Sequence, residues 1–301
     1  MHYLHLAANQ NNQYAQLIMG QIYFDGKYVT KNYGEAIIYF TLSANQNNSD
    51  AQYNLVLIYS DHNSNYYSKE KTLYYLNIMI QKNNSDAQYF LAMMYFNGSL
   101  LPKNYTKFIY YLTLAANQNN LDALCLLGSF YYYGQYVSID IKKSIYYLTL
   151  AANKNKLKAQ YLLGVIYNDK QYISYDINKS IHYFTLAANQ NNSDAQYNLG
   201  LIYHDKNFIS YDINKSVYYL RLASKQNTFA LFDLAMIYFN KNILNDITKS
   251  IQYFYDVANK TCYMTKYAQL ALGIIYYCDD RIPQDINKSI YYFKKSADQN
   301  N

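Results

Sequence analysis

The heptapeptide NNSDAQY occurs at residues 47–53, 83–89 and 191–197. The second copy starts 36 residues after the first, and the third starts 108 residues after the second, which is three times 36. A fixed period of this length is typical of repeat proteins, in which each helical hairpin stacks on the next to bury its apolar side chains. Any prediction of the fold therefore starts from the repeat.

The alanine of DAQY marks an equivalent position in every repeat, and these alanines follow one another at steps of 36, 36, 36, 36, 36, 35 and 38 residues. Counted from this alanine as offset zero, apolar residues stand at offsets 4 and 7, a small or medium-sized residue at offset 5 and a tyrosine at offset 8. This spacing predicts a helix with one apolar stripe, which we name helix A. The eight alanines are Ala15, Ala51, Ala87, Ala123, Ala159, Ala195, Ala230 and Ala268.

A second helix is predicted from the stretch YDINKSIHYF at residues 175–184, which recurs with small changes in other repeats and precedes a pair of alanines. We name it helix B. Asp176 and its equivalents stand where helix B begins, so their carboxylates can accept hydrogen bonds from free amides. Ser49 to Gln52 fits the S-x-x-Q pattern of a capping box at the start of helix A. The Asn pairs before helix A suit turns, because Asn tolerates left-handed backbone.

The pattern A-x-x-x-L-G-x-x-Y, followed by a loop and D-x-x-K-S-I-x-Y-[FL]-x-x-A-A, resembles the Sel1-like repeat family, a relative of the tetratricopeptide repeats. The resemblance covers essentially the whole chain and implies an all-α fold. We expect a right-handed α-solenoid, or superhelix, of about eight antiparallel helix A/helix B hairpins with a 36-residue period. It forms a single domain over residues 1–301. Residues 1–12 are a partial leading repeat with helix B only, and full repeats start near residues 13, 49, 85, 121, 157, 193, 228 and 266.

Composition excludes several classes of protein. The net charge is +6, but charged residues make up only 15% of the chain and the lysines are scattered, which does not favour nucleic-acid binding. Three cysteines without a C-x-x-C pair indicate neither a disulfide framework nor a zinc site. The amino terminus lacks the pattern of a secretion signal, and nowhere do 18 apolar residues follow one another. We therefore expect a cytoplasmic protein that does not cross a membrane.

Motifs of catalysis are missing from the sequence. The five histidines form no H-x-x-x-H or H-E-x-x-H arrangement, and no G-x-S-x-G, P-loop or G-x-G-x-x-G motif occurs. We predict no catalytic residue, no metal site and no cofactor. Tyrosines recur at offsets 8 and 24, where packing of the repeats explains them better than stacking on bases.

The predicted binding residues lie on another side of helix A. Offsets 2, 6 and 9 share one face, because residues three and four apart are neighbours on a helix. In tetratricopeptide relatives the corresponding face lines the concave groove, so the resemblance implies that this face meets a partner. Packing between neighbouring A helices is the alternative for offset 2. The residues that we predict to contact the partner are Tyr53, Tyr89, Phe96, Tyr161, Asn168, Tyr197 and His204.

The functional hypothesis is a non-enzymatic scaffold or adaptor that binds a peptide or helix on the concave helix A face. One alternative is a helical-repeat RNA-binding protein, although offset 2 lacks the polar residues that would read bases. Another is the adaptor part of a longer protein whose catalytic domain is absent here. Residues 2–8 align with the second half of a helix B, so Tyr3, Leu4 and Leu6 are expected to be poorly covered. The sequence therefore predicts either a piece of a longer array or self-association through the amino end.

Overall fold

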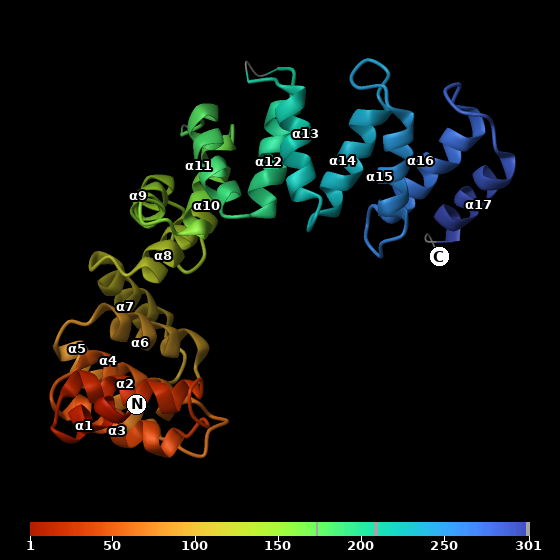
Figure 1. Ribbon diagram of the computed structural model, residues 1–301. Helices are drawn as coiled ribbons and strands as arrows, with labels where there is room; N and C mark the ends of the chain where they lie inside the picture. The colour runs from red at the N-terminus through yellow and green to blue at the C-terminus, as the bar shows by residue number, and fades with distance from the viewer. Residues whose placement is uncertain (173, 208–209, 299–301) are drawn as a thin grey trace. The chain divides into compact units, whose positions relative to one another are not determined.

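The structure is a computed structural model that describes residues 1–172, 174–207 and 210–298. In these ranges every regular element is a helix, and successive helices pair as hairpins (Figure 1). The chain forms two compact units, Met1–Lys154 and Asn155–Asn301. The all-α array of helix A/helix B hairpins that the period predicts is confirmed within each unit.

Helices of the A and B kinds alternate along the chain. In the first unit α1 is followed by four hairpins, α2–α3, α4–α5, α6–α7 and α8–α9, and the second unit holds four more, α10–α11, α12–α13, α14–α15 and α16–α17. The first unit comprises α1 (His2–Asn9), α2 (Gln13–Asp25), α3 (Tyr33–Asn45), α4 (Ser49–Ser60), α5 (Lys69–Gln81), α6 (Ser85–Asn97), α7 (Tyr105–Asn117), α8 (Leu121–Tyr133) and α9 (Ile141–Ala152). The second comprises α10 (Leu157–Asn168), α11 (Ile177–Asn189), α12 (Ser193–His204), α13 (Ile213–Ala223), α14 (Thr228–Phe239), α15 (Ile247–Ala258), α16 (Thr265–Cys278) and α17 (Ile286–Ala297).

Each hairpin is held together where offset 5 of helix A meets helix B. A Cβ added at Gly164 would lie 2.5 Å from Cδ1 of Phe184, so the ring of Phe184 occupies the space that a larger side chain would need. The hydroxyl of Ser180 donates a hydrogen bond of 2.8 Å to the carbonyl oxygen of Gly164. The same serine contact joins Ser144 to Gly128, Ser216 to Gly200, Ser250 to Ala235 and Ser289 to Gly273. The small residue and the serine of the K-S-I motif thus fix one close approach in each hairpin from α8–α9 to α16–α17, whereas the three hairpins before them have Ala36, Thr72 and Phe108 at the serine position.

The tyrosines at offsets 8 and 24 stack on one another. In the hairpin α10–α11, the ring centroids of Tyr167 and Tyr183 are 5.8 Å apart and the rings are nearly parallel, at 4°. Lys179 Nζ lies 5.2 Å from the Tyr167 centroid and 3.5 Å from Oδ2 of Asp176, which caps α11 by accepting from the Lys179 amide. This amide lowers the pKa of the Asp176 carboxyl below its usual value. The packing role of these tyrosines and the capping role of the aspartates are confirmed.

The capping box at the start of helix A was a wrong prediction. The N-cap of α4 is Asn48, whose side-chain oxygen accepts from the Ala51 amide at 3.0 Å, and Ser49 is the first helical residue. Gln52 does not reach back to its own cap. Its Nε2 donates to the carbonyl oxygen of Ala44 on the preceding helix B at 3.3 Å, so the glutamine joins successive hairpins. Asn47, just before the cap, has the left-handed backbone expected of the Asn pairs, with φ 66°.

The A helices end in two ways, and α4 of the first unit, which ends at the extended Asp61, follows the way of the second unit. In the first unit α2, α6 and α8 end at Gly26, Gly98 and Gly134, each with left-handed backbone. In the second unit all four A helices end at an extended Asp or Asn. Each of these side chains accepts a hydrogen bond from the amide two residues on, for example Asp205 Oδ1 from Asn207 at 2.9 Å. A side-chain turn therefore takes the place of glycine there.

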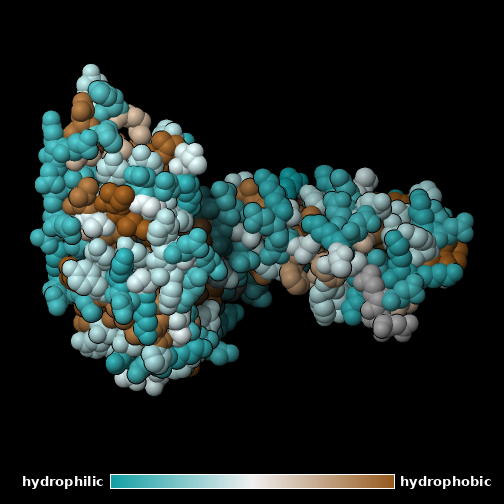
Figure 2. All heavy atoms as spheres, turned by 90° about the horizontal axis from the view of Figure 1, so that it is seen from below, coloured by the Kyte–Doolittle hydropathy of each residue, from teal (hydrophilic) through white to brown (hydrophobic). Residues whose placement is uncertain are grey.

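Apolar side chains also reach the surface of the first unit. Figure 2 shows hydrophobic residues gathered in separate patches over the amino-terminal hairpins, with polar residues between them. Tyr3 and Leu6 on α1 are exposed, whereas Leu4 packs against the small core formed with Ala8 and Met19. In the part of the chain that the structure describes, none of the helices has the length and apolar character needed to cross a membrane.

Candidate functional site

An exposed row of apolar side chains follows the helix A face of the second unit. Offset 6 is Leu201 on α12, Met236 on α14 and Ile274 on α16, and these side chains are 39%, 45% and 44% exposed. Isolated exposed apolar residues are common on protein surfaces, but a row at the same repeat position makes these side chains a candidate binding surface. The equivalent Val165 on α10 is half-buried.

Beside this row, Tyr197 on α12 and Asp233 on α14 form a polar contact between neighbouring repeats. The Tyr197 hydroxyl donates a hydrogen bond of 2.9 Å to Oδ2 of Asp233. Tyr197 stands at offset 2 of its repeat and Asp233 at offset 3 of the next, and both side chains are half-buried. A hydrogen bond to a charged acceptor in such surroundings is stronger than one in open water.

Asp233 also lines a pocket of about 200 Å3 between these two repeats. Leu201 and Met236 of the exposed row form part of its wall, together with Ile237 of α14 and Ile243 from the loop that follows α14. His204, the last residue of α12, lies at the same pocket. The structure thus brings two of the predicted binding residues, Tyr197 and His204, to one carboxylate.

The electrostatics of this site follow from its burial. Loss of water around Asp233 raises the pKa of its carboxyl, and the hydrogen bond from Tyr197 and the charge of His204 oppose that rise. The pKa of Tyr197 is raised as well, first by burial and then by the negative charge of Asp233. The pair therefore remains a neutral phenol bonded to an acid that is harder to ionise than an exposed aspartate.

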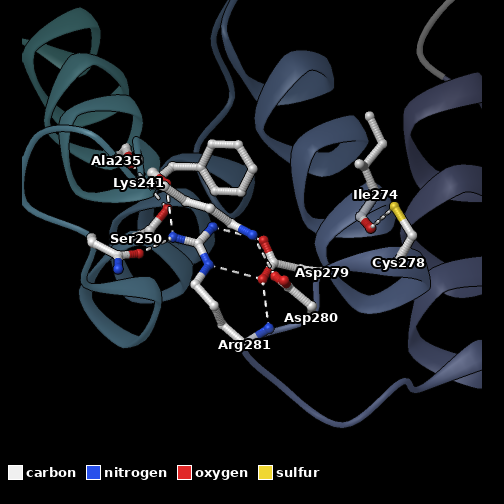
Figure 3. Close-up of polar contacts among 10 residues, drawn as sticks. Ala235, Lys241, Ser250, Ile274, Cys278, Asp279, Asp280 and Arg281 are labelled. Atoms are coloured by element: carbon white, nitrogen blue, oxygen red, sulfur yellow. Dashed lines mark hydrogen bonds and ion pairs between the residues drawn. The ribbon is translucent and has the colours of Figure 1, made fainter.

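An arginine from the next repeat holds the loop that carries Ile243 (Figure 3). Arg281, after α16, donates from Nη1 to the carbonyl oxygen of Phe239 and to Asn245 Oδ1, each at 2.9 Å. Its guanidinium lies over the Phe239 ring and pairs with Asp279 at 2.7 Å, which lowers the pKa of the Asp279 carboxyl. Lys241 in the same loop pairs with Asp280. Because both ends of the loop are bonded, one wall of the pocket is fixed by the repeat that follows.

The first unit has an apolar version of the same contact. Tyr53 on α4 meets the ring of Phe90 on α6 edge to face, with centroids 6.3 Å apart. These residues also stand at offset 2 of one repeat and offset 3 of the next. Tyr53 lines an open groove of about 510 Å3 between α2 and α4, next to Asn54, Ile18 and the charged Asp25.

The remaining predicted binding residues lie apart from one another. Tyr89 is half-buried on α6, and Asn168 is the last residue of α10. Tyr161 packs its ring against Phe184 of α11, with centroids 5.9 Å apart. Phe96 lies in an aromatic cluster with Phe108 of α7 and with Tyr136, which follows α8. Phe96 and Tyr161 therefore contact helix B or a loop of their own unit.

Sequence reasoning missed Asp233. The signal for it was an acidic residue inside a predicted helix A, at an offset where other repeats carry Asn54, Phe90, Leu162 or Asn198. The helical spacing groups offsets 2, 6 and 9 on one face and leaves out offset 3, and none of the predicted residues lies in the seventh repeat. Over the described residues, no group of three or more His, Cys, Asp or Glu side chains could hold a metal ion.

Comparison with known families identifies the repeat. The Sel1 repeat profile matches residues 13–48, 85–120, 121–156, 157–192, 193–227, 228–255 and 266–301. Because these matches cover well over half of the sequence, the chain belongs to the Sel1 repeat family. Residues 49–84 lie outside the matches, yet α4 and α5 form the same kind of hairpin there. A search of the curated proteins found no match.

Solved structures of similar fold include two repeat proteins. One is a Sel1 repeat protein from Oxalobacter formigenes, with 23% identity and a TM-score of 0.66, over 100% of this chain and 88% of that one. Another is a protective antigen of uropathogenic Escherichia coli strains that displays an SLR fold, with 21% identity and a TM-score of 0.53. This second match covers 99% of this chain and 72% of the other. At these identities the likeness concerns the fold alone.

Proposed function

We propose that this chain is a non-enzymatic scaffold that binds a protein partner, as a peptide or helix, on the helix A face. The observation that carries the proposal is the row of exposed apolar side chains Leu201, Met236 and Ile274 at one repeat position. An extended segment of a partner can lie along such a row, since each repeat offers it an equivalent contact.

The mixture of apolar and polar groups on this face supports a protein partner over a nucleic acid. Binding of a phosphate backbone depends on clustered lysine and arginine side chains. The pocket beside the row instead contains Asp233, which would repel phosphate. Membership of the Sel1 repeat family agrees with this choice, because stacked helical hairpins present long surfaces to partners.

A peptide-display selection on the full chain tests the proposal, followed by fluorescence anisotropy of the enriched peptides. We expect enriched peptides to bind the wild-type chain and to lose at least about tenfold in affinity for Met236→Lys, which places a charge in the apolar row. Tyr255→Lys is the matched control, because Tyr255 is 51% exposed on α15, a helix B.

Two results would overturn the proposal. One is a selection that enriches no peptide, or peptides whose affinity falls equally for Met236→Lys and Tyr255→Lys. The other is tight, salt-dependent binding of single-stranded RNA by the same protein, which would favour the RNA-binding alternative.

A further inference from the structure

The pocket between α12 and α14 joins apolar walls to a single carboxylate. Leu201, Met236, Ile237 and Ile243 form the apolar part, and Asp233 supplies the acid. The described residues that line the pocket include no lysine or arginine. With a volume of about 200 Å3, the pocket is smaller than the ~300 Å3 at which sites for drug-sized molecules begin. It has the size to accept one side chain of a larger partner.

Asp233 accepts its hydrogen bond from a neutral group, and the charge of His204 acts on it without an ion pair with lysine or arginine among the described residues. Oδ2 accepts from the Tyr197 hydroxyl, which is neutral. Among the residues that the structure describes, no lysine or arginine forms an ion pair with Asp233. A half-buried carboxylate in this state has lost water, and only His204 opposes its charge. A cationic group in the pocket would replace the solvation that burial removed.

The ends of two helices add to this preference. α12 ends at His204 and α14 ends at Phe239, and residues at both ends border the pocket. The carbonyl end of a helix carries a partial negative charge, which favours a cation within about one turn. The helix ends and the carboxylate therefore favour the same sign of charge.

We propose that this pocket binds the side chain of a lysine in the partner, with the ammonium group at Asp233 and the aliphatic stem along Leu201 and Met236. This proposal rests on the proposed function, because the protein partner supplies the lysine. A lysine combines a flexible apolar stem with a compact charge, as the pocket requires. Arginine fits less well, because its fork pairs best with two free carboxylate oxygens and Tyr197 already bonds to Oδ2.

The pocket can be tested without a peptide. N-acetyl-lysine N-methylamide is titrated into the full chain carrying ¹³C-labelled methionine methyl groups, and the signal of Met236 is followed by NMR. The norleucine derivative has nearly the same stem without the ammonium group, and the arginine derivative replaces the ammonium with a guanidinium. We expect a saturable shift of the Met236 signal with the lysine derivative, and affinities about tenfold weaker for the other two.

Two variants separate the pocket from the overall charge of the protein. Asp233→Asn should weaken binding of the lysine derivative about tenfold and leave the norleucine derivative unchanged. Asp256→Asn removes the same charge from an exposed position on α15 and should have no effect. Equal binding of lysine and norleucine, tighter binding of arginine, no shift at Met236, or equal losses in the two variants would each overturn the inference.

The selection described above tests the proposed function separately. If the chain binds the lysine derivative but none of the displayed peptides, the pocket stands as a site for amines and the scaffold function is wrong. If it binds peptides whose affinity does not depend on a lysine or on Asp233, the scaffold stands and this inference is wrong.

Discussion

Tyr53 in the first unit and Tyr197 in the second occupy the same repeat position and meet different neighbours. Tyr53 contacts the ring of Phe90, and Tyr197 donates a hydrogen bond to Asp233. In both places the neighbour stands at offset 3 of the next repeat. The repeat therefore fixes which positions meet, while the residue at offset 3 decides whether the contact is apolar or charged.

This difference shows how a regular array can carry a local specificity. Two contacts inside the hairpins recur in both units: the stacked tyrosines, and the serine bond at offset 5, which is present from the hairpin α8–α9 onward. They hold the backbone in a constant geometry. One substitution at offset 3 then changes the chemistry of the surface without changing the fold.

The largest expected effect on stability comes from exchanging the offset 3 neighbours, Phe90 and Asp233. Phe90 packs against the core that includes Val56 and Leu76, so Phe90→Asp loses a packed ring and half-buries a charge. We expect the free energy of unfolding to fall by about 2–4 kcal/mol, measured by urea denaturation. Asp233→Phe removes a half-buried charge beside an open pocket and should change stability by less than ~1.5 kcal/mol. Equal destabilisation by both variants would contradict the comparison.

Removing the hydroxyl of Tyr197 or of Tyr53 should lower the free energy of unfolding by smaller amounts, which differ between the two residues. Tyr197→Phe takes away the donor to Asp233 and should lower the free energy of unfolding by about 1–3 kcal/mol. In Tyr53→Phe the ring that meets Phe90 remains, so we expect a change below ~0.5 kcal/mol. Urea denaturation of the two variants side by side provides the measurement. A cost for Tyr53→Phe as large as that for Tyr197→Phe would show that the carboxylate is not what distinguishes the regions.

The two ways of ending helix A should also differ in how much stability a substitution to alanine removes. Gly98 has φ 71°, and Gly98→Ala forces a Cβ into left-handed backbone at a cost of about 1–2 kcal/mol. Asp205 has φ −74°, which any residue adopts, so Asp205→Ala loses the two exposed hydrogen bonds from the backbone amide and Nδ2 of Asn207 and about 0.5–1 kcal/mol. Thermal unfolding followed by circular dichroism can compare the two. The reverse order of midpoints would contradict this account of the turns.

The smallest expected effect is a dependence of the folding stability on pH. The folded pKa of Asp233 is raised, so between the unfolded value of about 3.9 and the folded value the native state binds the extra proton. Wild-type stability should therefore fall relative to Asp233→Asn as pH rises through this window. Asp176 has a lowered pKa and should behave oppositely in Asp176→Asn, its contribution being lost as pH falls. Melting temperatures from pH 3 to 7 would show the two slopes, and slopes of the same sign would contradict the assignment.

Much of the fold could be predicted from the sequence because its contacts are local and repeated. The tyrosine at offset 8 meets the one at offset 24 inside a single hairpin, and Asp176 caps a helix three residues from its partner amide. The identity of the N-cap of helix A was harder to predict. Asn48 and Ser49 are both good caps, and only the backbone conformation decides between them.

The candidate site was less predictable because its contacts join different repeats. Tyr197 and Asp233 are 36 residues apart, and whether offset 2 meets offset 3 depends on how one hairpin is tilted against the next. The pocket wall at Ile243 depends on Arg281, which lies in the following repeat. Helical spacing places Phe96 on the predicted binding face, and it could not show that the ring also packs against Phe108 of the next helix.

Hydrogen exchange of the full chain, with and without a selected peptide, shows whether a partner binds the helix A face of the second unit. We expect slower exchange over residues 193–204 and 228–239, which form α12 and α14, and little change over α13 and α15. Asp233→Asn should reduce this protection at the same peptide concentration. Slower exchange confined to α13 and α15, or to the first unit, would contradict the proposal.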